Sequence, residues 1–243
     1  MKPGIKSFAA AAALFAAGAA GQFALARANP SGAPRVGGGI VAAMGGLRSV
    51  AAEAVWFRAE RLQEQGRFAE LVQLAALLTF LEPHVAEVWT YSAWNLAYNV
   101  SVRMPREEDR WPWVLRAIRL LRDDGLKWNP GDPDICRELA FMFELKIGAK
   151  MDSAAPLYRE EWRKIASDVR DRGAWSELSM DPALMSAIEK EYGITDWTDA
   201  QASAIYWAKL GLEKADRRQA PFLAQILRQS LALYEKNRNT AKQ

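Results

Sequence analysis

The stretch 52-AEAVWFRAERLQEQGRFAELVQLAALLTFLEPHVAEVW-89 begins and ends on nearly the same letters. Residues 52–56 read AEAVW and residues 86–89 read AEVW. The small residues that follow each start keep one spacing, since Ala59 and Ala93 are 34 residues apart (93 − 59 = 34). A fixed period of this size is typical of a repeated supersecondary unit. The sequence therefore predicts that the chain starts the same structural unit at least twice.

That unit has the hydrophobic period of a helix pair. Apolar residues in 47–64 and 68–81 recur at steps of three and four, which is typical of amphipathic helices. Gly66 follows the first run and Pro83 the second, and both residue types end helices. Clean alternation of β-branched residues is missing after residue 40. We predict an all-α body of antiparallel helix pairs, either a bundle or an α-solenoid, with further helices over 86–102, 111–124, 134–147, 153–169, 182–192, 199–215 and 221–237.

Four predicted first helices align on one small residue each, at intervals of 34, 47 and 71 residues (93 − 59, 140 − 93 and 211 − 140); these residues are Ala59, Ala93, Ala140 and Gly211. The pattern resembles the tetratricopeptide repeat family, in degenerate form. Segment 52–85 matches that family with Ala59, Gly66, Phe68, Ala75 and Pro83. It departs from the family with Val55 in place of an aromatic residue, Arg58 in place of leucine and Leu71 in place of alanine. The later units keep fewer of these residues.

The resemblance implies a solenoid whose first helices line a concave groove. Carried over position by position, together with the mid-helix Asn95, it implies a partner-binding groove that contains Trp56, Glu60, Gln63, Thr90, Trp94, Asn95, Arg137 and Phe141. Trp89 falls one position earlier in its unit than Trp56, so we expect Trp89 to pack between helices and Trp56 to face the groove. Two alternatives stay open. Trp56 and Trp94 could pack against neighbouring helices, and in a purely structural assembly subunit both would be fully buried.

The N-terminus has the composition of a targeting segment. In residues 1–26, two lysines precede an uncharged, alanine-rich run with small residues at its end, which is typical of a secretory signal peptide. An uncleaved membrane anchor is the alternative. Residues 27–39 are rich in Pro and Gly and are predicted to be a linker. The predicted body then consists of tetratricopeptide-like repeats over 40–172 and an irregular helical unit over 173–243 that continues the array.

Composition narrows the function. The chain has 32 basic and 29 acidic residues, a balance that argues against nucleic-acid binding. His84 and Cys136 are the single residues of their types, and no nucleophile-elbow, phosphate-loop or zinc-protease motif is present. The acidic residues around Asn129-Pro130 are expected to cap helices rather than to bind calcium. We therefore expect no catalysis, no cofactor and no metal.

The expected function is a protein-binding or scaffolding module. The chain also resembles uncharacterised exported bacterial proteins of tetratricopeptide type, through residues 94–99 (WNLAYN) and 206–211 (YWAKLG). We expect an exported protein of the periplasm or cell envelope that binds another envelope protein or a peptide segment. It would touch the inner membrane only through residues 1–26, if these are retained. The alternative is a helical carbohydrate-binding or carbohydrate-active protein with a Trp-lined groove.

Overall fold

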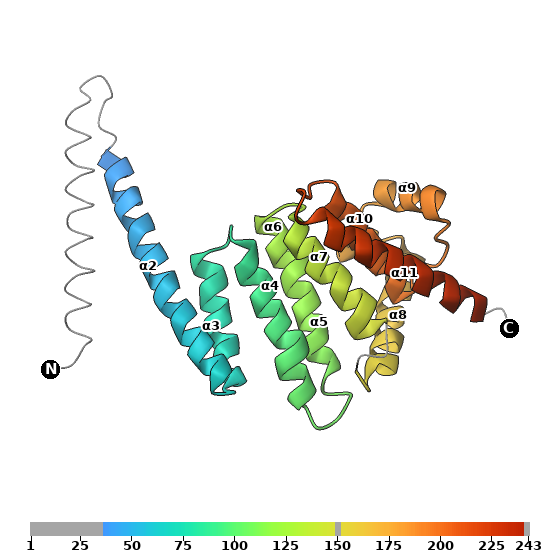
Figure 1. Cartoon of the computed structure of the whole chain (residues 1–243), viewed down its shortest axis with the longest axis horizontal. Coiled ribbons are helices and arrows are strands. Elements are labelled where there is room, and N and C mark those ends of the chain that lie inside the picture. Colours follow the sequence, from blue (N-terminus) through green and yellow to red (C-terminus); the bar gives the residue numbers. More distant parts are fainter. Residues whose placement is uncertain (1–35, 149–151, 241–243) are drawn as a thin grey trace, which may run out of the picture. The chain divides into compact units, whose positions relative to one another are not determined.

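A computed structural model describes residues 36–148 and 152–240 (Figure 1). Every regular element in these residues is a helix and none is a strand, which confirms the all-α prediction. The predicted signal peptide or anchor, residues 1–26, lies outside the described part. Among the described helices, none is both long and apolar enough to cross a membrane.

The helices follow one another through short turns. In chain order they are α2 (Val36–Glu64), α3 (Phe68–Leu81), α4 (Ala86–Trp94), α5 (Trp111–Arg119), α6 (Leu126–Trp128), α7 (Pro133–Phe141), α8 (Ala155–Arg172), α9 (Pro182–Tyr192), α10 (Ala200–Leu212) and α11 (Ala220–Thr240). Two 3₁₀ turns, η2 (Ser101–Arg103) and η5 (Trp175–Leu178), also occur in the described residues. The starts of these helices follow from the sequence. Asp132 accepts hydrogen bonds from the backbone N–H groups of Asp134 and Ile135, so it caps α7 as predicted.

Three consecutive helices widen into π-helix in their second half. These segments are η1 (Asn95–Val100) after α4, η3 (Leu120–Gly125) after α5 and η4 (Met142–Ile147) after α7. A π-turn inserts one residue into the helical ladder and is frequent at functional sites. Two of the three segments, η1 and η4, belong to neighbouring first helices of the predicted pairs.

The chain divides at Ala54 into two compact units, the second of which contains residues from Val55 onward. The first unit is described from Val36, where α2 begins. Helix therefore starts inside the predicted linker 27–39, and the unit boundary is at Ala54 rather than near Ile40. Once a helix has nucleated, each added residue gains a backbone hydrogen bond, which can offset the cost of glycine.

In the second unit, the first helices of successive pairs lie beside one another. Helix α4 packs against α7, and α7 packs against α10. At the N-terminal end, Ala59 and Leu62 of α2 form a small apolar cluster with two leucines of α3 and with Val88 of α4. The larger apolar core runs from α4 through α7 and α8 to α10 and α11. This order of helices is the one expected from the 34-residue spacing.

The last helix departs from a simple array. Helix α11 packs against α10 and also reaches back to α7, and Figure 1 shows it crossing in front of α10. Gly211 makes this close packing possible. A Cβ atom at this position would lie 2.9 Å from Cβ of Cys136 on α7 and 3.0 Å from Cδ2 of Leu223 on α11. The small residue predicted from the repeat alignment is therefore required by three helices rather than by one pair.

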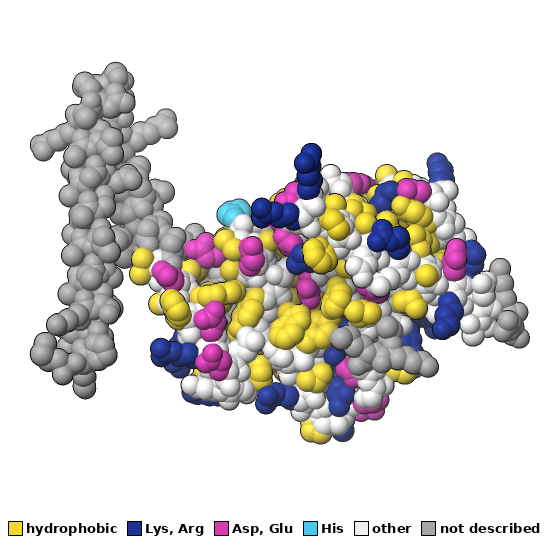
Figure 2. Space-filling view, viewed as in Figure 1, with side chains coloured by type: hydrophobic (Ala, Val, Ile, Leu, Met, Phe, Trp, Pro, Cys, Tyr) yellow, Lys and Arg dark blue, Asp and Glu magenta, His cyan; other side chains and the backbone are white. Residues whose placement is uncertain are grey.

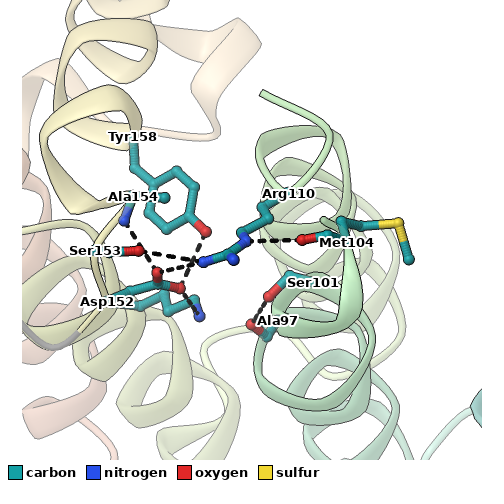
Figure 3. Close-up of polar contacts among 9 residues, drawn as sticks. Ala97, Ser101, Met104, Arg110, Asp152, Ser153, Ala154 and Tyr158 are labelled. Atoms are coloured by element: carbon teal, nitrogen blue, oxygen red, sulfur yellow. Dashed lines mark hydrogen bonds and ion pairs between the residues drawn. The ribbon is translucent and has the colours of Figure 1, made fainter. Parts of the chain in front are cut away.

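A buried carboxylate joins the second and third helix pairs (Figure 3). Asp152 accepts hydrogen bonds from Lys146 Nζ at 2.6 Å, from Arg110 Nη1 at 3.2 Å and from Tyr158 Oη at 3.1 Å. It also accepts one from the Ala154 N–H at the start of α8. Burial would raise the pKa of Asp152, but the hydrogen bonds and the charge of Lys146 hold it below its ordinary value. This group satisfies a buried lysine and fixes η4 against α8.

Candidate partner-binding surface

Five aromatic side chains follow one another across the first helices of the second unit. We call Trp56, Tyr91, Trp94, Tyr98 and Phe141 the aromatic strip. The ring centroids of Trp56 and Tyr91 are 4.8 Å apart, those of Trp94 and Tyr98 are 5.8 Å apart, and those of Tyr98 and Phe141 are 6.4 Å apart. Residues from α2, α4, η1 and α7 therefore form one surface. Figure 2 shows hydrophobic side chains gathered in the middle of the view, over α4 and α7.

The strip is accessible in a way that the core aromatics are not. Trp94 is 39% exposed, and Trp56, Tyr91, Tyr98 and Phe141 are half-buried. The hypothesis of a purely structural subunit required Trp56 and Trp94 to be fully buried, so that expectation is wrong. Trp89, five residues before Trp94 on the same helix, is 4% exposed and donates its indole N–H to the Pro83 carbonyl. The predicted difference between Trp56 and Trp89 is therefore confirmed at the level of burial.

The polar residues predicted for the groove lie around the strip. Glu60 is exposed, while Gln63 and Thr90 are half-buried. Gln63 Oε1 accepts a hydrogen bond from Tyr91 Oη at 2.6 Å, and Thr90 donates to the Glu87 carbonyl of its own helix. Glu60 thus presents a free carboxylate beside Trp56 and Tyr91, whereas Gln63 holds the Tyr91 ring in place.

Asn95 requires a correction. Its side chain is 2% exposed, and its amide donates to the Tyr91 carbonyl at 3.0 Å. Its Oδ1 atom accepts a hydrogen bond from Asn99 at 2.6 Å. The amide is thus used inside the helix where η1 widens, so we leave Asn95 out of the partner-binding surface.

Arg137 is placed on the predicted face, but its charge is already balanced. Its Nη1 atom lies 2.6 Å from Oδ1 of Asp134. The other carboxylate oxygen of Asp134 accepts a hydrogen bond from Gln219 of α11. Arg137 is therefore part of a link between α7 and the last helix, and it contributes little net positive charge to the strip.

Acidic and phenolic groups lie beneath the strip. Oη of Tyr98 and Oε1 of Glu138 are enclosed and have no hydrogen-bond partner among the described residues. Burial raises the pKa of the Glu138 carboxyl to about 7, against a smaller opposing effect of Arg137. Burial also raises the pKa of the Glu144 carboxyl to about 7. Burial and the charges of these two glutamates together raise the pKa of Tyr98 well above its ordinary value.

Sequence reasoning missed this polar cluster. The residues concerned are Tyr98, Glu138, Glu144 and Lys146. A signal was present in residues 143–147 (FELKI), where two charged residues alternate with apolar ones inside a helix that has no exposed face to receive them. The π-turns η1 and η4, which rotate these side chains inward, leave no recognisable trace in the sequence.

Two other residues that attracted attention in the sequence have structural surroundings. Cys136 is buried, and burial raises the pKa of its thiol to about 12, so this residue is not a reactive thiolate. His84 is exposed in the turn before α4, where its Nδ1 atom lies 3.2 Å from the Trp128 carbonyl. Neither residue belongs to the strip.

No protein-family model, no curated protein and no solved structure matches this chain.

Proposed function

We propose that this chain is an exported, tetratricopeptide-like scaffolding protein of the cell envelope that holds a segment of another envelope protein against its aromatic strip. The observation that carries the proposal is the exposure of Trp94 beside the rings of Tyr98 and Phe141. Contiguous aromatic surface of this kind is typical of protein–protein recognition sites, where Trp and Tyr contribute most of the binding free energy. No catalytic step is part of this proposal.

The stacking of the first helices supports a segment-binding role. Helices α4 and α7 lie side by side, so their half-buried aromatic residues form a continuous strip rather than isolated spots. An extended or helical segment could place apolar side chains against Trp56, Trp94 and Phe141. Glu60 at one end of the strip and Arg137 at the other would then set its register.

Co-purification tests the proposal in its natural setting. We expect the full-length, tagged chain to retain one envelope protein in stoichiometric amount, and the Trp94→Ala variant to lose it. Trp128→Ala is the matched control, because Trp128 is 48% exposed but lies outside the strip, against His84. Equal retention by both variants, or no stoichiometric partner, would contradict the proposal.

The proposed location follows from residues 1–26 alone. The segment is proposed to direct export to the periplasm, where the body stays free after cleavage or remains anchored to the inner membrane. N-terminal sequencing of the mature protein separates these two outcomes. A mature chain that begins at or before Met1, recovered from the cytosolic fraction, would contradict export.

A carbohydrate ligand is the competing hypothesis, and the exposed Trp94 ring also favours it, because sugar rings stack on tryptophan. Cell-wall oligosaccharides that change the Trp fluorescence, with no change produced by peptides, would replace the scaffold proposal by a carbohydrate-binding function.

A further inference from the structure

We infer that the partner segment carries a positively charged side chain, arginine or lysine, which lies against Trp94 and Phe141 and donates hydrogen bonds to Glu138 and Tyr98. This inference rests on the proposed function and specifies the chemistry of the partner that the strip takes. Three independent observations support it.

The first observation is the charge around the strip. Residues 86–100, which make up α4 and η1, contain Glu87 as their single charged residue and no Lys or Arg. Arg137 is neutralised by Asp134, and Lys146 lies 2.6 Å from Asp152. The carboxyl groups of Glu60 and Glu138 are therefore left without a matching positive charge on this face. A cationic partner group complements such a surface.

The second observation is the pair of unsatisfied oxygen atoms. Enclosed polar atoms without a partner cost about 1–3 kcal/mol each, so most proteins pair them. The orphan atoms of Tyr98 and Glu138 belong to half-buried side chains on adjacent helices, η1 and α7. Both can accept a hydrogen bond from an N–H donor. A guanidinium or ammonium group carries several such donors and can satisfy both atoms at once.

The third observation is the set of rings at the same place. Trp94, Tyr98 and Phe141 follow one another at centroid distances of 5.8 and 6.4 Å. Cations are attracted to aromatic faces within about 6 Å, most strongly to tryptophan. The chain already uses this interaction on the inner side of the strip, where Lys146 Nζ lies 5.3 Å from the Tyr98 ring centroid. Its ion pair with Asp152 compensates that inner charge and leaves the outer side open to a second cation.

Access to the enclosed oxygen atoms requires a small movement. Phe141 is half-buried at the edge of the cluster, one turn after Glu138 on the same helix. Rotation of its ring would admit the end of an arginine or lysine side chain, and side-chain rotations of this size are common on binding.

A pair of matched small probes tests the inference on the full-length chain. The probes are N-acetyl-leucyl-arginine methylamide and the same compound with neutral citrulline in place of arginine. The readout is the indole N–H signal of Trp94 in ¹H–¹⁵N NMR spectra, assigned with the Trp94→Phe variant. We expect the arginine compound to shift this signal with about fivefold higher affinity than the citrulline compound, and to leave the Trp128 signal unchanged.

Two variants keep the test specific. Glu138→Gln, which preserves shape, should remove the preference for arginine, and an unchanged Trp89 signal shows that the fold is intact. Glu160→Gln, an exposed position on α8, should keep the preference. Equal affinities for the two probes, a preference that survives Glu138→Gln, or no shift at all would overturn the inference. A Trp94 shift that depends on protein concentration alone would also overturn it, because a second copy would then cover the strip.

The two proposals fail separately. If Trp94-dependent co-purification persists while the arginine probe shows no preference, the scaffold function stands and the cationic partner is wrong. If co-purification also fails, both are wrong.

Discussion

The first-helix face of this protein differs at its two ends in what covers it. Over α10, the chain supplies its own cover, since α11 packs on α10 and reaches α7. The residues of α10 are almost all buried there, and many are small, among them Ala202, Ala204, Ala208 and Gly211. Over α4 and the first part of α7, the surface carries Trp94, Tyr98 and Phe141 instead. Where the chain covers itself the side chains are small, and where the described chain leaves the face open they are aromatic and acidic.

This difference indicates two kinds of interface. Small residues let helices approach closely and serve permanent packing within the fold. Aromatic residues next to unpaired carboxyl groups are typical of surfaces that a separate molecule covers. The comparison can be broken or sharpened by substitutions at each end.

The largest contrast is expected within α4 itself. Trp89→Ala should lower the free energy of unfolding by about 3–5 kcal/mol, because it empties a packed site and removes a hydrogen bond to Pro83. Trp94→Ala should change it by less than about 1 kcal/mol, since the ring is largely outside the core. Urea unfolding followed by circular dichroism measures both. Similar losses for the two variants would show that Trp94 belongs to the core.

A smaller effect depends on pH. The folded pKa of Glu144 is about 7 and the ordinary value is 4.5, so the folded state binds this proton more tightly. Stability linked to Glu144 is therefore full below about pH 4.5 and is lost as the pH rises through 7. Glu144→Gln removes the charge, so it should stabilise the protein by roughly 3 kcal/mol at pH 8 and by almost nothing at pH 4.5. Urea midpoints at the two pH values test this, with Glu160→Gln as an exposed control.

The smallest of these effects concerns the covered end. Gly211→Leu should cost about 1–3 kcal/mol, because the new side chain meets Cys136 and Leu223. Ala232→Leu, an exposed position on α11, should leave the melting temperature nearly unchanged. A tolerated leucine at position 211 would mean that α7, α10 and α11 are not packed as closely as described.

The sequence predicted the helices and their order, and the reasons are visible in single residues. Gly66 ends the first helix of the opening pair, Asp132 caps α7, and the period of 34 residues places α2 and α4 in equivalent positions. These signals are local, so they can be seen in one sequence. The position of α11 could not be predicted, because it depends on which distant surface, α7 or solvent, the helix covers.

The surface was predictable in part for the same reason. The helical positions of Trp56, Trp94 and Phe141 follow from the repeat spacing, and all three lie on the strip. Asn95 was placed there from its position on the helix, but the π-turn η1 draws its amide into the interior. Glu138 and Tyr98 escaped notice, because their importance lies in hydrogen bonds that are missing among the described residues rather than in a residue pattern.

The central claim is that the aromatic strip is open in the isolated protein and covered by a partner. Hydroxyl-radical footprinting of the full-length chain, read by mass spectrometry, tests it most directly. We predict that Trp94 is oxidised several times faster than Trp89 in the isolated chain, and that its rate falls when the co-purifying partner is bound, while the rate at Trp128 is unchanged. Slow oxidation of Trp94 in the isolated chain, equal to that of Trp89, would show that the protein covers this surface itself and would contradict the account.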